Sequence, residues 1–303
     1  MNDIMTEREY QHFIMSYLEH RNGYHIRHAT KAGGDYDRRF AMDRGMLFEF
    51  LSQTQTDKLA ELRKQYGKTT EETLVNFLNS EITKKGSSLI HVLMHGVDVT
   101  PSLHLDLMYR KPATDFNPQL TKLYQQNLFS VMEEVWPDDE TRVDLVLFLN
   151  GLAIISMELK CNTAGTGWDY REAIRQYRED RDCTTRLLDP KAGALAHFAV
   201  DLNEAYVCTE LRGKESTFLP FNQGYNPNGG DAHATGPGNP PSPNGPRTSY
   251  LWEDVFSKDS VFELVYDFVY MAAKRDKRGK KTGEARIFPR FQQLRAVRKV
   301  VRD

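Results

Sequence analysis

The stretch between residues 142 and 160 constrains the fold more than any other part of the chain. It contains two apolar segments joined by Asn150-Gly151, a pair that is a strong signal for a β-hairpin. An unpaired charge inside an apolar strand costs several kcal/mol, so charged residues in such segments need partners. We therefore expect three side chains of this stretch to converge on one another and on a bound cation: Asp144, Glu158 and Lys160.

The spacing of these charges sets a condition on the hairpin. Glu158 and Lys160 lie two positions apart, so their side chains leave the same face of a strand. A regular two-residue turn would place Asp144 on the opposite face. We predict instead a three-residue loop over 149–151, with Gly151 in the left-handed region and a bulge beside it, or an equivalent one-residue shift. A regular hairpin with Asp144 facing away would contradict the site.

The same residues have the chemistry of a metal-dependent nuclease. The carboxylates of Asp144 and Glu158 and the carbonyl of Leu159 are oxygen donors of the kind that Mg²⁺ prefers. A cation at such a site activates water for attack on a phosphodiester, and Lys160 orients that water or stabilises the developing charge. The alternative is a strand-end Asp144 with an exposed edge pair, but the flanking residues are too apolar for an exposed edge.

Asp144 followed by Glu158-Leu159-Lys160 resembles the Asp…Glu-x-Lys core of the PD-(D/E)xK nucleases. The surrounding sequence is similar to a narrower group, the N-terminal nuclease domain of the restriction (R) subunit of type I restriction-modification enzymes. This similarity extends over nearly the whole chain. It is carried by the segments 143–151, 157–160, 173–178, 180–182, 218–222 and 238–241.

The resemblance implies an α/β fold: a mixed β-sheet flanked by helices, with a PD-(D/E)xK restriction-endonuclease-like core and an N-terminal helical extension. It implies Mg²⁺-dependent endonucleolytic cleavage of double-stranded DNA, the activity of a type I site-specific deoxyribonuclease. The implied partners are DNA and the methyltransferase (M) and specificity (S) subunits of the complex. In that family, cleavage is coupled to an ATP-driven translocating motor, and another subunit recognises the DNA sequence.

The helix expected after the Lys160 strand contains further candidates. Related nucleases often carry a Gln-x-x-x-Tyr pair here, whereas in this chain Gln176 is followed directly by Tyr177 and position 180 is Asp. Tyr177 belongs to an apolar stripe, so it is either a core residue or a DNA contact. Gln176 either orients Lys160 or touches a phosphate. Four basic residues either reach DNA phosphates or belong to a solvated face: Arg171, Arg175, Arg178 and Arg181.

An additional acid often comes from the N-terminal helix of such nucleases. The candidates are Glu7 and Glu9 in a helix expected over 6–20, which begins at a capping threonine. A charge at the start of a helix, or on its surface face, accounts for both residues without any role in the site.

Residues 287–297 resemble the start of the helicase-like motor of the same family, in which Gln293, in preference to Gln292, would read the adenine of ATP. No Gly-x-x-x-x-Gly-Lys-Ser/Thr loop occurs in the chain, so ATP would serve only a longer subunit of which this is the nuclease portion. We expect a nuclease domain over 1–272, helical to about residue 100 and containing the catalytic sheet over about 101–272. A basic connector and the beginning of the motor would follow over 273–303.

Composition restricts how such a chain binds DNA. A net charge of −2 lacks the broad basic surface that drives non-specific affinity. The dense basic run over 274–281 is interpreted as a charged connector. No run of about 18 apolar residues and no secretory leader is present, and three cysteines match no zinc spacing, so we expect a protein of the cytoplasm that is not bound to membranes.

Periodicity and turn signals indicate the remaining elements. Helices are expected over 46–82 and 250–270, and strands over 103–108, 128–136, 196–200 and 205–208. Residues 220–248 are rich in Pro, Gly and Asn and predict a long loop.

Two other functions remain compatible with the sequence. One is a module that does not cleave DNA but docks the motor and the methyltransferase subunits, with the charged triad kept as a structural network. The other is a solitary PD-(D/E)xK repair nuclease, which the motor-like end of the chain disfavours.

Overall fold

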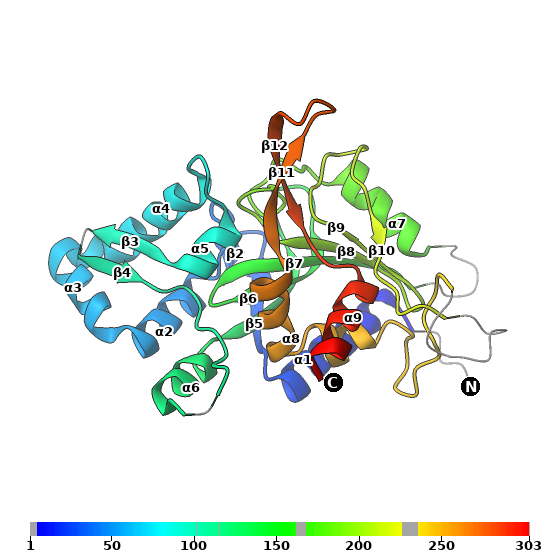
Figure 1. Cartoon of the computed structure of the whole chain (residues 1–303), viewed down its shortest axis with the longest axis horizontal. Coiled ribbons are helices and arrows are strands. Elements are labelled where there is room, and N and C mark those ends of the chain that lie inside the picture. Colours follow the sequence, from blue (N-terminus) through cyan, green and yellow to red (C-terminus); the bar gives the residue numbers. More distant parts are fainter. Residues whose placement is uncertain (1–4, 101, 115, 162–167, 226–235, 303) are drawn as a thin grey trace.

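A computed structural model describes residues 5–100, 102–114, 116–161, 168–225 and 236–302. Its centre is an eight-stranded mixed sheet with the strand order β10-β9-β8-β7-β6-β5-β1-β2, flanked by helices (Figure 1). This arrangement confirms the predicted α/β class and mixed sheet. The strands are β1 (His25–Thr30), β2 (Gly33–Gly34), β5 (Phe129–Val135), β6 (Val143–Leu149), β7 (Leu152–Leu159), β8 (Ala196–Val200), β9 (Ala205–Cys208) and β10 (Leu219–Pro220).

Two small antiparallel pairs stand apart from the main sheet in the described residues. They are β3 (Val97–Thr100) with β4 (Leu103–Leu105), and β11 (Tyr270–Arg275) with β12 (Lys281–Ile287). Within the main sheet, β1 runs parallel to β5 and β7 parallel to β8, while the other neighbours are antiparallel.

The α-helices are α1 (Glu7–Asn22), α2 (Arg44–Thr54), α3 (Thr56–Tyr66), α4 (Thr70–Thr83), α5 (Leu89–His95), α6 (Pro118–Gln125), α7 (Tyr170–Arg175), α8 (Lys258–Glu263) and α9 (Phe291–Arg302). Shorter helical segments are Gly67–Thr69, Gln176–Asp180, Leu251–Val255 and Leu264–Phe268. Helices α2 to α5 gather with β3 and β4 at one end of the molecule (Figure 1). No helix in the described part of the chain has the length and apolar character needed to cross a membrane.

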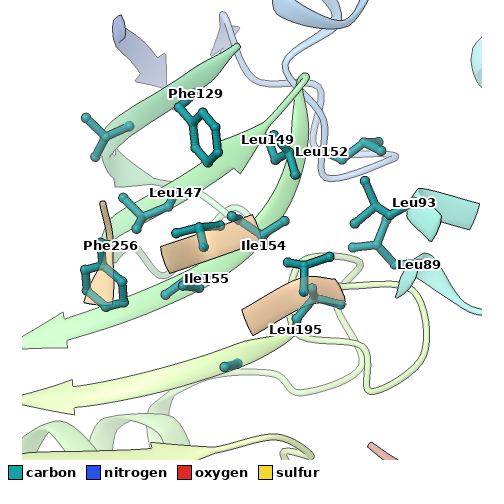
Figure 2. Close-up of a cluster of buried hydrophobic side chains, with 14 of the residues drawn as sticks. Leu89, Leu93, Phe129, Leu147, Leu149, Leu152, Ile154, Ile155, Leu195 and Phe256 are labelled. Carbon is teal, nitrogen blue, oxygen red and sulfur yellow. The ribbon is translucent and has the colours of Figure 1, made fainter. Parts of the chain in front are cut away.

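The central strands are apolar because both faces of the sheet are covered. Leu145, Leu147 and Leu149 of β6 point into the larger hydrophobic core, which also contains residues of α1 and α8. Figure 2 shows part of this core around Leu147 and Leu149. Val146 and Phe148 point into a second core on the other face. Neither face is left to solvent, so any charge on these strands must be stabilised inside the protein.

The hairpin between β6 and β7 differs from the predicted loop but keeps the predicted shift. Asn150 and Gly151 form a two-residue turn with φ of 49° and 79°, and Leu149 pairs with Leu152, so the three-residue loop was wrong. The irregularity lies further from the turn, where Ile154 is one extra residue in β7. Its effect is to put Asp144 on the same face as Glu158, as the one-residue shift required.

Side-chain contacts of Asn150 explain why the tight turn is stable. Its amide nitrogen donates to the Leu107 carbonyl and to Asn127 Oδ1, both at 2.9 Å, and its Oδ1 accepts from the Leu128 amide at 2.7 Å. These partners lie more than 20 positions away in the sequence, so a local pattern does not reveal them. They favour the left-handed conformation that the turn needs at Asn150.

The predicted division into two domains near residue 272 stays a prediction. Residue 272 lies inside β11, and the segment expected as a connector forms a β-hairpin. Phe291 and Leu294 of α9 are buried in the same core as the central strands, so the terminal helix packs onto the sheet domain. The N-terminal part is not purely helical either, because β1 pairs with β5 in the main sheet.

Other expected elements agree with the structure to varying degrees. Strands 196–200 and 205–208 coincide with β8 and β9, and 128–136 contains β5. The strand expected over 103–108 ends at Leu105, and the helical region expected over 250–270 ends at Phe268. Of the predicted 220–248 loop, residues 226–235 lie outside the described part of the chain.

Gly151 tests the importance of the turn. A Cβ there would lie 2.3 Å from the Asp43 carbonyl oxygen and 2.7 Å from the Leu47 amide nitrogen, both backbone atoms. We expect Gly151→Ala to lower the free energy of unfolding by more than about 3 kcal/mol, because strain and a clash add. Gly86→Ala is the matched control, since Gly86 also has positive φ but open space around it. Urea unfolding should show a loss of only about 1 kcal/mol for the control.

Candidate functional site

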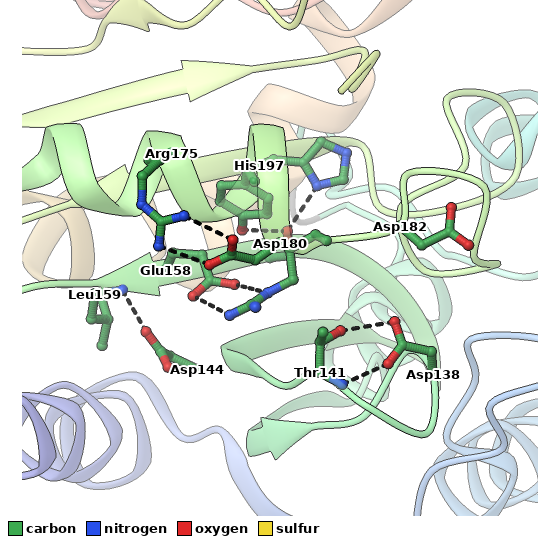
Figure 3. Close-up of polar contacts among 12 residues, drawn as sticks. Asp138, Thr141, Asp144, Glu158, Leu159, Arg175, Asp180, Asp182 and His197 are labelled. Atoms are coloured by element: carbon green, nitrogen blue, oxygen red, sulfur yellow. Dashed lines mark hydrogen bonds and ion pairs between the residues drawn. The ribbon is translucent and has the colours of Figure 1, made fainter. Parts of the chain in front are cut away.

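The three predicted charged residues meet where β6 begins and β7 ends. Asp144 and Glu158 face the same side on neighbouring strands, and Figure 3 shows them close together next to Leu159. Lys160 follows β7 directly, and its amide donates to the Val200 carbonyl at 2.8 Å, which continues the pairing with β8. Glu158 is fully buried and Lys160 is 2% exposed. The structure thus brings the predicted triad together at the ends of two interior strands, β6 and β7.

Asp144 is held by a backbone amide on one side and by a glutamine side chain on the other. Its Oδ2 accepts a hydrogen bond from the Leu159 amide at 2.7 Å, and its own carbonyl accepts from Gln11 Nε2 at 2.8 Å. Burial raises the pKa of the Asp144 carboxyl to about 6, although Lys160 and the Leu159 amide oppose the shift. No hydrogen bond from the described residues reaches Oδ1, which leaves one carboxylate oxygen available for a ligand.

Glu158 forms a buried ion pair with Arg181. The guanidinium donates from Nε at 2.7 Å and from Nη2 at 3.0 Å, one bond to each carboxylate oxygen. Burial and the nearby Asp144 charge raise the pKa of Glu158 to about 8, while Arg181 lowers it. Arg181 was expected only among arginines that face DNA or solvent. The signal available in the sequence was the apolar segment around Glu158, which indicates a buried carboxylate that needs a counter-ion but does not identify that counter-ion.

Lys160 is held by a residue from the N-terminal helix. Its Nζ donates to both carboxylate oxygens of Glu7 at 3.0 Å and to the Leu159 carbonyl at 2.8 Å. Glu7 therefore lies in the site, whereas a helix-start charge had seemed sufficient to explain it. Glu9 does have that local role, since it forms a capping box with Thr6. The Thr-x-x-Glu spacing could have assigned Glu9 to the cap and left Glu7 as the acid for the site.

A polar cleft of about 520 Å³ adjoins these residues. Glu7 and Gln11 line it, and the same two residues contact Lys160 and the Asp144 carbonyl. The cleft therefore lies beside the triad on the side of α1, and the contacts of Glu7 and Gln11 connect the two. Its other lining residues are Arg8, His28, Ala29, Glu133, Glu134 and Arg142.

The donor set is compatible with a hard, oxygen-liganded cation. Asp144, Glu158 and the Leu159 carbonyl supply oxygens close together. Burial first, and neighbouring carboxylates after it, raise the pKa values of both acids, so a cation would stabilise their ionised forms. Two of these oxygen donors would have to bind the ion while they also accept hydrogen bonds. The Glu158 carboxylate accepts from Arg181, and the Leu159 carbonyl accepts from Lys160. No cluster of three or more His, Cys, Asp or Glu side chains suited to a metal occurs among the described residues. An ion here would keep several waters, as Mg²⁺ commonly does.

Tyr177 belongs to the core. It is fully buried, and its hydroxyl lies 2.8 Å from Ser156 Oγ, which lies 2.8 Å from Nδ1 of the buried His197. This burial favours the core alternative for Tyr177. The hydrogen-bonded chain Tyr177–Ser156–His197 joins β7 to β8 next to Glu158, because Ser156 lies on the same face of β7 two residues before Glu158.

The other candidates on this segment form contacts within the protein. Arg175 pairs with Glu172 and Asp180, and Arg178 donates to the Ser216 carbonyl at 2.7 and 3.0 Å. Gln176 is half-buried, and its Oε1 has no hydrogen-bond partner in the described residues. Contacts of these three residues with DNA, and of Gln176 with Lys160, stay predictions.

Gln293 lies at the beginning of α9, far along the chain from the triad. Its Oε1 accepts a hydrogen bond from the Arg290 amide at 2.8 Å and so caps the first turn of the helix. The predicted contact with adenine is not tested by this geometry.

Arg181→Met tests the buried ion pair. Removing the guanidinium takes both hydrogen bonds from the buried Glu158 carboxylate. Above about pH 8, where that carboxylate is ionised in the wild type, we expect the free energy of unfolding to fall by about 3–5 kcal/mol. Arg175→Met is the matched control, because its side chain is 42% exposed and its ion pairs are at the surface. The control should cost less than about 1 kcal/mol in urea unfolding. Equal losses in the two variants would contradict a special role for the Arg181 pair.

The raised pKa values predict a pH dependence of stability in the absence of metal. The folded state binds protons at Asp144 and Glu158 more tightly than the unfolded state, so the stability that they contribute is complete below about pH 4. It is lost as the pH rises through the folded values of about 6 and about 8. Urea unfolding in EDTA should therefore show that the wild type loses stability relative to Glu158→Gln as the pH rises. Parallel profiles would contradict the assignment.

Comparison with known proteins agrees with the geometry. No curated protein matched the chain. The family described as "Type I restriction enzyme R protein N terminus" matches residues 4–216, a span that includes α1, the central strands and all residues of the triad. Because this match covers more than half of the chain, the protein belongs to the family of type I restriction enzyme R protein N-terminal domains.

Proposed function

We propose that this chain is a Mg²⁺-dependent endonuclease module that cleaves double-stranded DNA as part of a type I restriction enzyme R subunit. The observation that carries the proposal is the convergence of Asp144, Glu158 and Lys160 at one buried edge of the sheet beside a polar cleft. Three charges in apolar strands are costly for the fold, and catalysis gives a reason to retain them.

Asp144 and Glu158 would hold the ion with their carboxylates, and the Leu159 carbonyl would add a third oxygen. When bound, Mg²⁺ supplies Lewis-acid stabilisation of a phosphodiester and lowers the pKa of water. Oδ1 of Asp144 would bind the ion first, because Oδ2 accepts from the Leu159 amide and no hydrogen bond from the described residues reaches Oδ1.

Lys160 would act on the reacting atoms as a fixed cation. Its ammonium is restrained by Glu7 and by the Leu159 carbonyl, so it needs little reorganisation to orient water or to stabilise charge on a phosphate. Glu7 is a positioning residue that holds this ammonium. Arg181 balances the charge of Glu158 and would share that carboxylate with the ion.

Family membership supports further proposals about partners. The chain would act with methyltransferase and specificity subunits and with an ATP-driven motor that delivers DNA, the motor being where Gln293 would contact adenine. A net charge of −2 gives weak affinity for DNA on its own, which is consistent with delivery by such partners. Sequence recognition would then lie outside this chain.

One observation favours a second candidate, a docking module that does not cleave DNA. Both oxygens of Glu158 are already bonded to Arg181, and the Leu159 carbonyl is bonded to Lys160. The triad would then be an internal salt-bridge network that shapes this edge of the sheet. The two candidates differ in whether the site binds a metal ion.

Metal titration together with DNA nicking distinguishes them. We expect the wild type to bind Mn²⁺ or Mg²⁺ in isothermal titration. The Asp144→Asn variant should not bind the metal, and the Lys160→Met variant should still bind it. Plasmid nicking at low salt should be lost by at least about a hundredfold in both variants, since each removes a group that acts on the reacting atoms. Asp98→Asn is the matched control, because Asp98 is an exposed residue of β3, and it should behave as the wild type.

The other outcomes are also informative. Metal binding without nicking by the wild type would mean that cleavage requires the motor and the partner subunits. No metal binding in any variant would favour the docking module.

A further inference from the structure

The hairpin β11–β12 projects from the body of the molecule (Figure 1). It forms a two-stranded sheet of its own, and its register runs from Tyr270 opposite Ile287 to Arg275 opposite Lys281. A two-stranded hairpin is only marginally stable by itself, so contacts with the main domain are needed to keep it folded. A projecting ribbon of this kind is available to an external partner.

The base of the hairpin is fixed to the main domain. Arg286 is only 4% exposed and donates to the Ala194 carbonyl at 2.7 Å and to the Pro190 carbonyl at 2.5 Å. On the other strand, Lys274 pairs with Glu210 at 2.7 Å. These contacts fix the orientation of the hairpin relative to the main domain, and its tip extends beyond them.

The tip concentrates positive charge. Seven basic and two acidic residues lie between positions 270 and 287, although the whole chain has a net charge of −2. The carboxylate of Asp276 accepts hydrogen bonds from the Arg278 and Lys280 amides, so it shapes the turn. Three exposed side chains at the tip have no ion pair with any described residue: Lys277, Arg278 and Lys280.

We propose that the β11–β12 hairpin binds the phosphate backbone of duplex DNA. The unpaired cations are complementary to phosphates, and a two-stranded β-ribbon fits the major groove of B-DNA. That the polyanion is DNA rests on the function proposed above. The apolar pair Tyr270 and Ile287 lies at the base, away from the charged tip, so charge dominates the part that reaches outward.

The position of the hairpin suits a duplex that also reaches the triad. Both sites are attached to the β8 region, the hairpin at Ala194 before the strand and Lys160 opposite Val200 at its end. Six residues of extended chain separate these points by roughly 20 Å, which corresponds to about six base pairs along DNA. The attachment point of the hairpin and the triad therefore lie within the length of one short duplex.

The test removes the three unpaired charges at once. A variant carrying Lys277→Gln, Arg278→Gln and Lys280→Gln is compared with the wild type for binding of a fluorescent DNA duplex, measured by anisotropy in EDTA over a range of salt concentrations. The matched control removes three exposed charges in and just after α3, at the end of the molecule where α2 to α5 gather (Figure 1): Arg63→Gln, Lys64→Gln and Lys68→Gln. All three proteins should have the same thermal midpoint.

We expect the hairpin variant to lose at least about tenfold in affinity at low salt, with a salt slope reduced by about 2 to 3, and the control to match the wild type. A hairpin variant that binds as the wild type does would overturn the proposal and would direct attention to a protein partner. Equal losses in both variants, or no DNA binding by the wild type, would also overturn it.

The measurement excludes metal and cleavage, so it is independent of the nuclease proposal. Loss of binding in the hairpin variant, together with a wild type that neither binds metal nor nicks DNA, would leave the hairpin as a DNA contact and reject the nuclease. Metal-dependent nicking by the wild type, together with unchanged DNA binding by the hairpin variant, would support the nuclease and reject the hairpin as a DNA contact.

Discussion

The one-residue irregularity at Ile154 is the constraint on which the rest of the site depends. Side chains alternate along a strand, so one extra residue in β7 decides which residues of β7 share a face with Asp144. With it, Asp144 joins Glu158, and the leucines of β6 remain in the large core. A regular hairpin would separate the two carboxylates. The bulge therefore reconciles a packed core with a charged edge on the same pair of strands.

Charges in apolar strands made the convergence of the triad predictable, because isolated burial would be too costly. The turn was harder, since Asn150 is stabilised by Leu107 and Asn127, which are close only after folding. Strand β1 was missed because its sequence His-Ile-Arg-His-Ala-Thr has no apolar alternation, and it is a strand through its pairing with β5. The basic run over 274–281 hid a hairpin for a similar reason, since its charges suggested a connector.

The counter-ions show the same limit. Burial of Glu158 and Lys160 indicated that partners must exist, but Arg181 and Glu7 come from segments on either side of the central strands. Three carboxylates and two cations thus share one small region, an imbalance that a divalent ion would reverse. Physical chemistry therefore predicts the need for compensation, while the identity of each partner depends on the tertiary fold.

Glu7 lies in the first turn of α1, where backbone amides lack partners within the helix. That turn is stabilised by the capping box of Thr6 and Glu9, neither of which bonds to Lys160. If the cap opens, the first turn frays and the carboxylate that restrains the lysine ammonium is released. The precision with which Lys160 is held is thus governed by the stability of a helix end, so a ligand or modification at the start of α1 would change the position of the lysine ammonium.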